Sequence, residues 1–571
     1  MKLAPAPTAP TATSWEAVSP TVALAATGAE SSKRPDEAAL GAWNERLILF
    51  SGVFLTLLLT MLPYLALHSY FPFGGDIQHA LNVQHLLQAG WPLPPLGTPP
   101  EQYPNSYGYL AASLARLSGL GTLDVLKVLP VLSVMTSAVA VYVAARGMFS
   151  RRVAALALLS FAALSYEPRA NFFAATDIDL LTGSTITPLY LWALSATVGR
   201  TQYRWPILGG LLAGTIIRYH ALDTSMALAA SILFLLGLTI VRRDLLSRAL
   251  LRRLGLLTAL ALLAGLPYSA YDASIYVNTV LDRLGLRSVP WSDVAFPRVN
   301  FPADYPYFLG PVLSFLLPVA IGVFVLRRST WRRYSTGALV LGAWIVTLAL
   351  GCLTSIFLAP LRSLYLLPLP GAILLGLLLD GILSARPRAS IRLATAALLS
   401  FVVLTGTGFI ALRSVGAGSG MEFAGRQDLA SLSALHTAWA RAPQSYVVSD
   451  ESGPWVPYYV DGQAYFIQGG PAAFPLFGQP VRTWFGDLWS ALQQPCNAGS
   501  VETLRRYNVR FVYLGRPPRH WVQPGYIYNS GSQFSSCGSF TPTYSETTAE
   551  GTISIYELAE GQNASELLPG P

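Results

Sequence analysis

The chain has 571 residues, of which 52% are hydrophobic and only 12% are charged. Soluble domains carry roughly 25% charged residues, so this composition excludes an ordinary soluble protein. The formal net charge of +8 comes mostly from short arginine clusters between apolar runs. That spacing is typical of membrane topology, so we expect no nucleic acid among the partners.

The N-terminal segment 1–45 is rich in Ala, Pro, Thr and Ser, with no apolar period. We predict a disordered cytoplasmic tail here. Residues 46–412 then contain apolar runs long enough to cross a bilayer, which takes about 18 or more residues. They predict an α-helical polytopic membrane protein with about eleven spans. The expected spans lie near 47–67, 126–146, 153–166, 180–198, 205–220, 224–241, 251–270, 307–326, 336–358, 361–383 and 391–412.

Every second connection between these spans is rich in arginine. These basic connections are 146–152, 200–204, 242–253, 327–333 and 386–392, together with the N-terminal residues Lys33, Arg34 and Arg46. The alternating connections are neutral or acidic, namely 68–125, 167–179, 221–223, 271–306 and 359–360. Under the positive-inside rule the N-terminus is cytoplasmic, and an odd number of spans places residues 413–571 outside.

The polar region 413–571 alternates strand-like runs with helical segments. The strand-like runs are 445–450, 509–515 and 552–558, and the helical segments are 427–442 and 500–508. This alternation predicts a small exterior α/β or α+β domain. Cys496 and Cys537 lie in it and could pair if the region is outside the cytoplasm, although the sequence leaves that open.

The first candidate site residue is Asp76, which follows Gly74 and Gly75 just after the first span. Its carboxylate could act as a general base or hold a divalent cation. The alternative is a helix N-cap for the amphipathic segment that follows. His79 lies three residues on and can meet Asp76 on one helical face, whereas His85, six residues after His79, fits that face poorly.

A second acidic cluster occurs in the next exterior connection. Asp177 and Asp179 flank one isoleucine at a membrane boundary. Paired carboxylates at this spacing can hold Mg²⁺ or Mn²⁺ through oxygen ligands. Their alternative role is solubilising charge and an N-cap at the end of the loop.

Two arginines depart from the inside rule. Arg218 and Arg362 lie near the exterior ends of apolar runs. Each could extend harmlessly to the interface, or could bind a lipid phosphate as a charge-assisted partner. Charged residues within or at the edge of a membrane span are candidates for a functional role.

This layout resembles the GT-C superfamily of polytopic membrane glycosyltransferases, in an uncharacterised bacterial branch. The local resemblance lies in 75-GDIQHALNVQHLLQAGWP-92 with 103-YPNSYGYLAASLARLSG-119, and in 507-YNVRFVYLGRPPRHW-521 of the exterior domain. The WWDYG motif of oligosaccharyltransferases does not occur in the C-terminal region. We therefore do not expect recognition of a peptide sequon.

The resemblance implies transfer of a hexosyl or pentosyl group from a polyprenyl-phosphate donor at the outer face of a bacterial inner membrane. Asp76 would be the acid that activates the acceptor or binds metal, and Asp177 and Asp179 would match the acids of metal-dependent members. Arg218 and Arg362 would hold the lipid phosphate. The acceptor, whether glycan, lipid or protein, stays open. The rival interpretations are a transporter or flippase of lipid-linked glycans and a non-catalytic membrane scaffold.

Overall fold

A computed structural model of the chain describes residues 35–67, 83, 87, 106–165, 181–219, 221–266, 309–353, 360–384, 400–412, 426–450, 456–460, 463–467, 479–515, 532–548 and 551–559. The chain divides into two units, Met1–Ile48 and Leu49–Pro571. The contacts reported below lie within the second unit.

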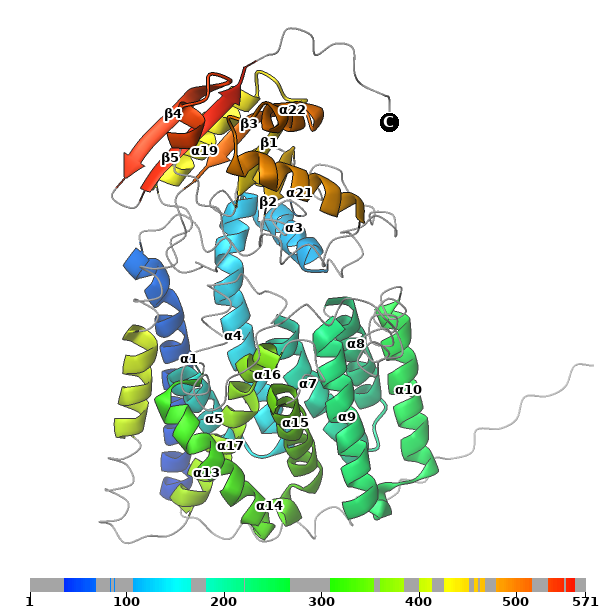
Figure 1. The fold of residues 1–571 in the computed structure, drawn as a ribbon. Helices are drawn as coiled ribbons and strands as arrows, with labels where there is room; N and C mark the ends of the chain where they lie inside the picture. The colour runs from blue at the N-terminus through cyan, green and yellow to red at the C-terminus, as the bar shows by residue number, and fades with distance from the viewer. Residues whose placement is uncertain are drawn as a thin grey trace, which may run out of the picture. The chain divides into compact units, whose positions relative to one another are not determined.

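Each of the expected spans contains a helix (Figure 1). Within the described part of the chain, five stretches are long and apolar enough to cross a membrane: Glu45–Leu62, Asp124–Met148, Asp223–Val241, Ser335–Leu353 and Ser363–Ser384. Helices Pro311–Leu326 and Ser400–Leu412 are apolar but shorter. The membrane part comprises α1 (Pro35–Leu67), α4 (Thr122–Met148), α5 (Arg151–Leu164), η2 (Thr182–Ile186), α7 (Thr187–Gly199), α8 (Arg204–Tyr219), α9 (Ala221–Val241), η3 (Arg243–Leu245), α10 (Arg248–Gly265), α13 (Pro311–Leu326), α14 (Arg328–Arg333), α15 (Ser335–Leu353), α16 (Pro360–Leu366), α17 (Pro368–Ser384) and Ser400–Leu412.

The first helix begins earlier than the sequence indicated. The segment 1–45 was expected to be disordered, but α1 begins at Pro35. Proline is favoured at the first helical position. Residues 1–34 lie outside the described part of the chain.

Two expected spans contain a break. The span expected at 180–198 opens with the short π-helix η2 before α7, and π-helical turns are frequent at functional sites. The span expected at 361–383 is divided at Leu367 into α16 and α17. Pro368 explains the second break, because proline disfavours helical geometry in the residue before it.

Helices α8 and α10 run parallel and pack closely through glycines. A Cβ added at Gly210 would lie 2.7 Å from the Leu257 carbonyl oxygen, and one at Gly214 would lie 3.0 Å from the Ala261 carbonyl oxygen. Gly210 and Gly214 form the small-xxx-small spacing that lets membrane helices approach backbone to backbone. The pairing aligns each residue of α8 with the residue about 48 positions later in α10, as Gly209 with Leu257 shows.

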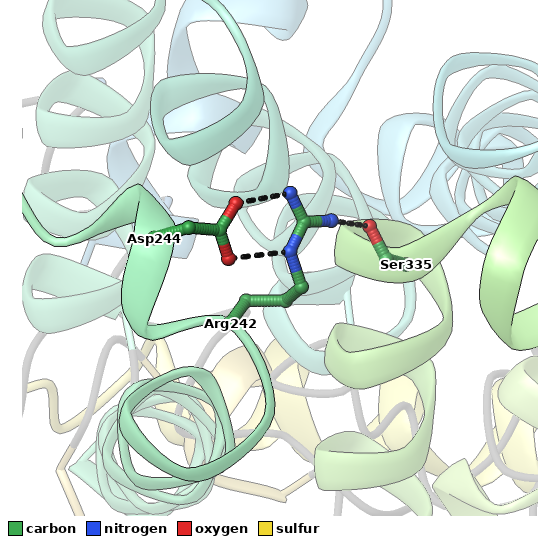
Figure 2. A network of polar contacts seen from close by, with 3 residues as sticks. All are labelled: Arg242, Asp244 and Ser335. Atoms are coloured by element: carbon green, nitrogen blue, oxygen red, sulfur yellow. Dashed lines mark hydrogen bonds and ion pairs between the residues drawn. The ribbon is translucent and has the colours of Figure 1, made fainter.

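The basic connections meet one another at one end of the helices, which we call the basic face. Figure 2 shows Arg242, which follows α9, between Asp244 and Ser335. Its Nε and Nη2 donate to the two carboxylate oxygens of Asp244 at 2.9 and 2.7 Å, and Nη1 donates to Ser335 Oγ at 2.6 Å. The hydrogen bonds from Arg242 hold the pKa of Asp244 below its ordinary value. Arg242 therefore joins the end of α9 to the start of α15.

Other contacts bring the remaining described basic connections to the same face. Arg152 Nε lies 3.2 Å from Asp380 Oδ1 and joins the start of α5 to the end of α17. The rings of Phe149 and Tyr334 meet edge to face with centroids 5.4 Å apart. A Cβ at Gly337 would lie 2.6 Å from the Met148 carbonyl oxygen, and one at Gly199, just before the connection 200–204, would lie 3.5 Å from Thr336 Oγ1. The alternation of basic and neutral connections thus corresponds to a real grouping in space.

The C-terminal region forms a five-stranded mixed sheet, as the sequence predicted in type (Figure 1). Its strands are β1 (Tyr446–Asp450), β2 (Ala464–Ile467), β3 (Val509–Leu514), β4 (Phe540–Thr548) and β5 (Gly551–Leu558) in the order β2-β1-β3-β5-β4. β1 pairs in parallel with β2 and β3, while β5 pairs antiparallel with β3 and β4. The helices of this region are α19 (Arg426–Trp439), α20 (Val456–Tyr459), α21 (Gln479–Gln493), α22 (Ala498–Arg506) and α23 (Ser532–Ser535).

Successive side chains of a strand point to opposite faces of the sheet. Here each face is buried in a hydrophobic core of its own. Phe511 and Tyr513 of β3 lie in a cluster with Leu432 and Leu435 of α19. Val512 between them lies in a second cluster that includes residues of α21 and α22. Cys496 and Cys537 form a disulfide beside this second cluster, with Cα atoms 5.1 Å apart.

The cluster that contains Phe511 and Tyr513 also includes residues from the connection 68–125 and from the start of α4. We call it the junction cluster. Ala111 and Ala112 of α3 (Ser106–Ser118) belong to it, as does Val125 near the start of α4. Val83 is buried in it, and Leu87, four residues on, packs against it. Because α4 begins in the junction cluster and ends at Met148 on the basic face, these two regions lie at opposite ends of that helix.

Candidate functional site

The structure describes only part of the predicted site. Asp76, His79, Asp177 and Asp179 lie outside the described residues, so their roles stay predictions. Arg218 is described in full. For Arg362 the structure describes the backbone, within the first turn of α16, and not the side chain.

Arg218 lies in the last turn of α8, and its side chain is exposed. Its Nη2 donates a 2.9 Å hydrogen bond to the carbonyl oxygen of Leu266, the residue that caps α10. A guanidinium group in this place is favoured by the negative ends of two helix dipoles and satisfies a carbonyl that the helix leaves unpaired. The arginine is thus fixed at the ends of the parallel helices α8 and α10, opposite the basic face.

The start of α9 and the end of α16 meet at the π-helix η2. A Cβ at Gly183 would lie 2.8 Å from Leu366 Cδ1 and 2.9 Å from Asp223 Oδ1. Only a glycine leaves room for both neighbours. Asp223 lies five residues after Arg218, and Leu366 lies one helical turn after Arg362. Helix α8, which carries Arg218, also contacts η2, so the elements that carry the two predicted phosphate-binding arginines converge on η2.

Asp223 is a buried carboxylate beside η2 that was not among the residues predicted from the sequence. It lies in the first turn of α9 and is 1% exposed. A carboxylate near a helix N-terminus is stabilised by the dipole, and burial of a carboxylate demands such compensation. The available signal was an acid at the exterior boundary of a strongly apolar span, four residues after the tyrosine of 216-IIRYHALD-223.

Hydroxyl groups hold η2 against α4. Ser137 Oγ donates to Ser184 Oγ at 2.8 Å and lies 3.1 Å from Thr185 Oγ1. Thr136 Oγ1 lies 3.3 Å from the same Thr185 oxygen. Such contacts between helices replace hydrogen bonds that lipid cannot provide. They fix the π-helical turn whose glycine faces Asp223.

Leu181 and Tyr219 connect this region to the C-terminal domain. Both pack against the junction cluster, Leu181 from the residue before η2 and Tyr219 from the end of α8. The predicted acids Asp177 and Asp179 stand just before Leu181 in the sequence. In the part of the chain that is described, no group of three His, Cys, Asp or Glu residues could hold a metal ion. The predicted metal ligands lie outside that part.

Solved structures share this architecture over most of the chain. The oligosaccharyltransferase of Archaeoglobus fulgidus superposes with a TM-score of 0.58 at 12% identity, over 81% of this chain and 69% of its own. ArnT from Cupriavidus metallidurans, in a structure with undecaprenyl phosphate, gives 0.54 at 15% identity, over 91% and 98%. Both are GT-C glycosyltransferases. This chain has the GT-C fold.

A third GT-C structure agrees with this result. The arabinofuranosyltransferase AftD from Mycobacteria gives a TM-score of 0.57 at 14% identity, over 91% of this chain and 40% of its own length. No protein-family model and no curated protein sequence matches the chain. The expected GT-C-like membrane fold is therefore confirmed through its three-dimensional arrangement.

The convergence at η2 predicts that Gly183 tolerates no side chain. We expect Gly183→Ala to lower the stability of the purified protein by about 1–3 kcal/mol, because Leu366 and Asp223 are both buried and cannot move aside freely. Gly255→Ala is the control, since nothing lies within 4 Å of a Cβ there. Thermal unfolding in one detergent measures both. Equal unfolding temperatures for the two variants would contradict the convergence.

Proposed function

We propose that the chain is a membrane glycosyltransferase that moves a sugar from a polyprenyl-phosphate donor to an acceptor. The observation that carries the proposal is the GT-C fold, shared over nearly the full length with ArnT, whose structure contains undecaprenyl phosphate. The arrangement around η2 supports it further, because two arginine-bearing elements and a buried carboxylate meet there.

We assign the donor phosphate to Arg218 and Arg362. A phosphate monoester or diester is recognised well by a guanidinium group, which can donate two parallel charge-assisted hydrogen bonds. Arg218 is exposed and fixed at the end of α10, so its position requires little ordering when the donor binds. Arg362 would approach from α16, whose last residue lies against η2.

The proposed chemistry is an inverting displacement. Asp76 accepts the proton of the acceptor hydroxyl, whose oxygen forms a bond to the anomeric carbon. The bond from that carbon to the phosphate oxygen breaks, and the electron pair leaves with the polyprenyl phosphate. The two arginines stabilise the charge that develops on that phosphate. His79 would orient Asp76 from the same helical face.

We propose that the reaction occurs at the outer face of a bacterial inner membrane. The basic connections form one face of the bundle, and the positive-inside rule assigns such a face to the cytoplasm. The disulfide between Cys496 and Cys537 supports an exterior location for the C-terminal domain, because disulfides persist in oxidising compartments.

The direct test is transfer of labelled sugar by the purified protein in lipid, from a panel of polyprenyl-phosphate sugars. We expect Asp76→Asn to lower the rate by about 10²–10⁴-fold, the usual contribution of a general base. Arg218→Gln should weaken donor binding by about tenfold or more, since a hydrogen bond to a charged group is lost. Glu502→Gln, an exposed carboxylate of α22, is the control. Donor binding without transfer under every condition would favour a flippase or a scaffold.

A cation held by Asp177 and Asp179, with or without Asp76, is the second part of the proposal. Mg²⁺ or Mn²⁺ there would neutralise charge on the leaving phosphate. We expect chelation by EDTA to abolish transfer and added Mg²⁺ or Mn²⁺ to restore it. An Asp177→Asn, Asp179→Asn double variant should lose activity together with the metal response. Full activity in EDTA would assign charge stabilisation to the arginines alone.

A further inference from the structure

The basic face carries a tryptophan between two arginines. The guanidinium carbon of Arg200 lies 4.8 Å from the centre of the Trp205 ring, and that of Arg204 lies 5.0 Å from it. Both arginines are exposed, while Trp205 is only 8% exposed. Two positive groups are thus held together over one aromatic ring, by cation–π attraction, without an ion-pair partner among the described residues.

Arg253 of α10 adds a third positive charge. The register that aligns Gly209 with Leu257 aligns Trp205 with Arg253, one helical turn closer to the basic face. Arg253 is 7% exposed and belongs to the buried stripe of α10. A buried guanidinium group is costly unless it is paired.

Buried donors here have no acceptor. Within the described residues, Arg253 Nη1 and Trp205 Nε1 are both buried and lack a hydrogen-bond partner. Both groups can only donate. Two unsatisfied donors and three guanidinium groups in one neighbourhood favour an anionic acceptor, and the described residues do not supply one.

The surroundings of this cluster are apolar and exposed. Tyr203 is 56% exposed, Ile207 43% and Leu251 63%, all on the same two helices or at the start of α8. Such side chains next to guanidinium groups match the boundary between acyl chains and headgroups. A free anion would use the charges but leave these apolar side chains uncovered.

We infer that Arg200, Arg204, Trp205 and Arg253 form a binding site for the phosphate of an anionic phospholipid at the basic face. The headgroup phosphate accepts hydrogen bonds from Arg253 and the Trp205 indole, and its acyl chains cover Ile207 and Leu251. The site lies at the opposite ends of α8 and α10 from Arg218. It is therefore separate from the proposed donor site and does not depend on the proposed reaction.

Lipid binding by the purified full-length chain tests the assignment, with phosphatidylglycerol and phosphatidylcholine of equal acyl length titrated by native mass spectrometry. Both lipids carry the phosphate, but the three guanidinium groups repel the choline cation of phosphatidylcholine, so we expect the first phosphatidylglycerol to bind about tenfold more tightly. Arg253→Gln should remove that preference, and Arg253→Lys should retain part of it. Equal binding of the two lipids by the native chain would overturn the proposal.

Matched variants separate this site from general surface charge. Arg328→Gln removes one exposed arginine elsewhere on the basic face and should leave the preference intact; loss of the preference in this variant would contradict a defined site. If Arg253→Gln does not fold, the exposed pair Arg200→Gln, Arg204→Gln provides the same test and should also reduce the preference. Displacement of the lipid by millimolar inorganic phosphate would assign the site to a free anion and overturn the lipid assignment.

Discussion

The exclusion of charge from the hydrocarbon core is the constraint on which the rest of this structure depends. It confines the arginines of the membrane part to the connections and to the helix ends, and the connections then hold one another. Arg242 joins α9 to α15, and Arg152 joins α5 to α17. Because α4 runs from the junction cluster to this basic face, the helix that contacts the C-terminal domain ends among these charges.

The same constraint gives the two ends of the bundle different chemistry. At one end the arginines are numerous and meet acids, hydroxyl groups and a tryptophan. At the other, Arg218 is fixed by a carbonyl of α10, and the buried Asp223 faces the glycine of η2. The parallel pair α8 and α10 carries guanidinium groups at both ends, and a phosphate site is proposed at each end. Close packing through Gly210 and Gly214 keeps both ends in register.

Hydropathy was sufficient to predict the helices of the membrane part, and alternation predicted β1, β3 and β5. Helices α20, α21 and α23 of the C-terminal domain were not predicted. β2 was missed because it has only four residues, and β4 because its sequence FTPTYSETT has little apolar alternation and contains a proline, which an edge strand tolerates. The burial of Asp223 beside Gly183 depends on a contact between η2 and α9. The anchoring of Arg218 depends on a hydrogen bond to Leu266, 48 residues later in the sequence. Neither of these contacts can be predicted from the local sequence. The predictions for Asp76, His79, Asp177 and Asp179 concern residues outside the described chain.

The orientation of the two ends across the membrane is measured most directly with single cysteines and a maleimide that cannot cross the inner membrane. The native background is low, since Cys352 is buried and the other two cysteines form a disulfide. In intact cells, a cysteine at the exposed Ser490 of α21 should react, whereas one at Arg252 on the basic face should react only after the membrane is permeabilised. Labelling of the Arg252 position in intact cells, with the Ser490 position protected, would contradict transfer at the exterior face.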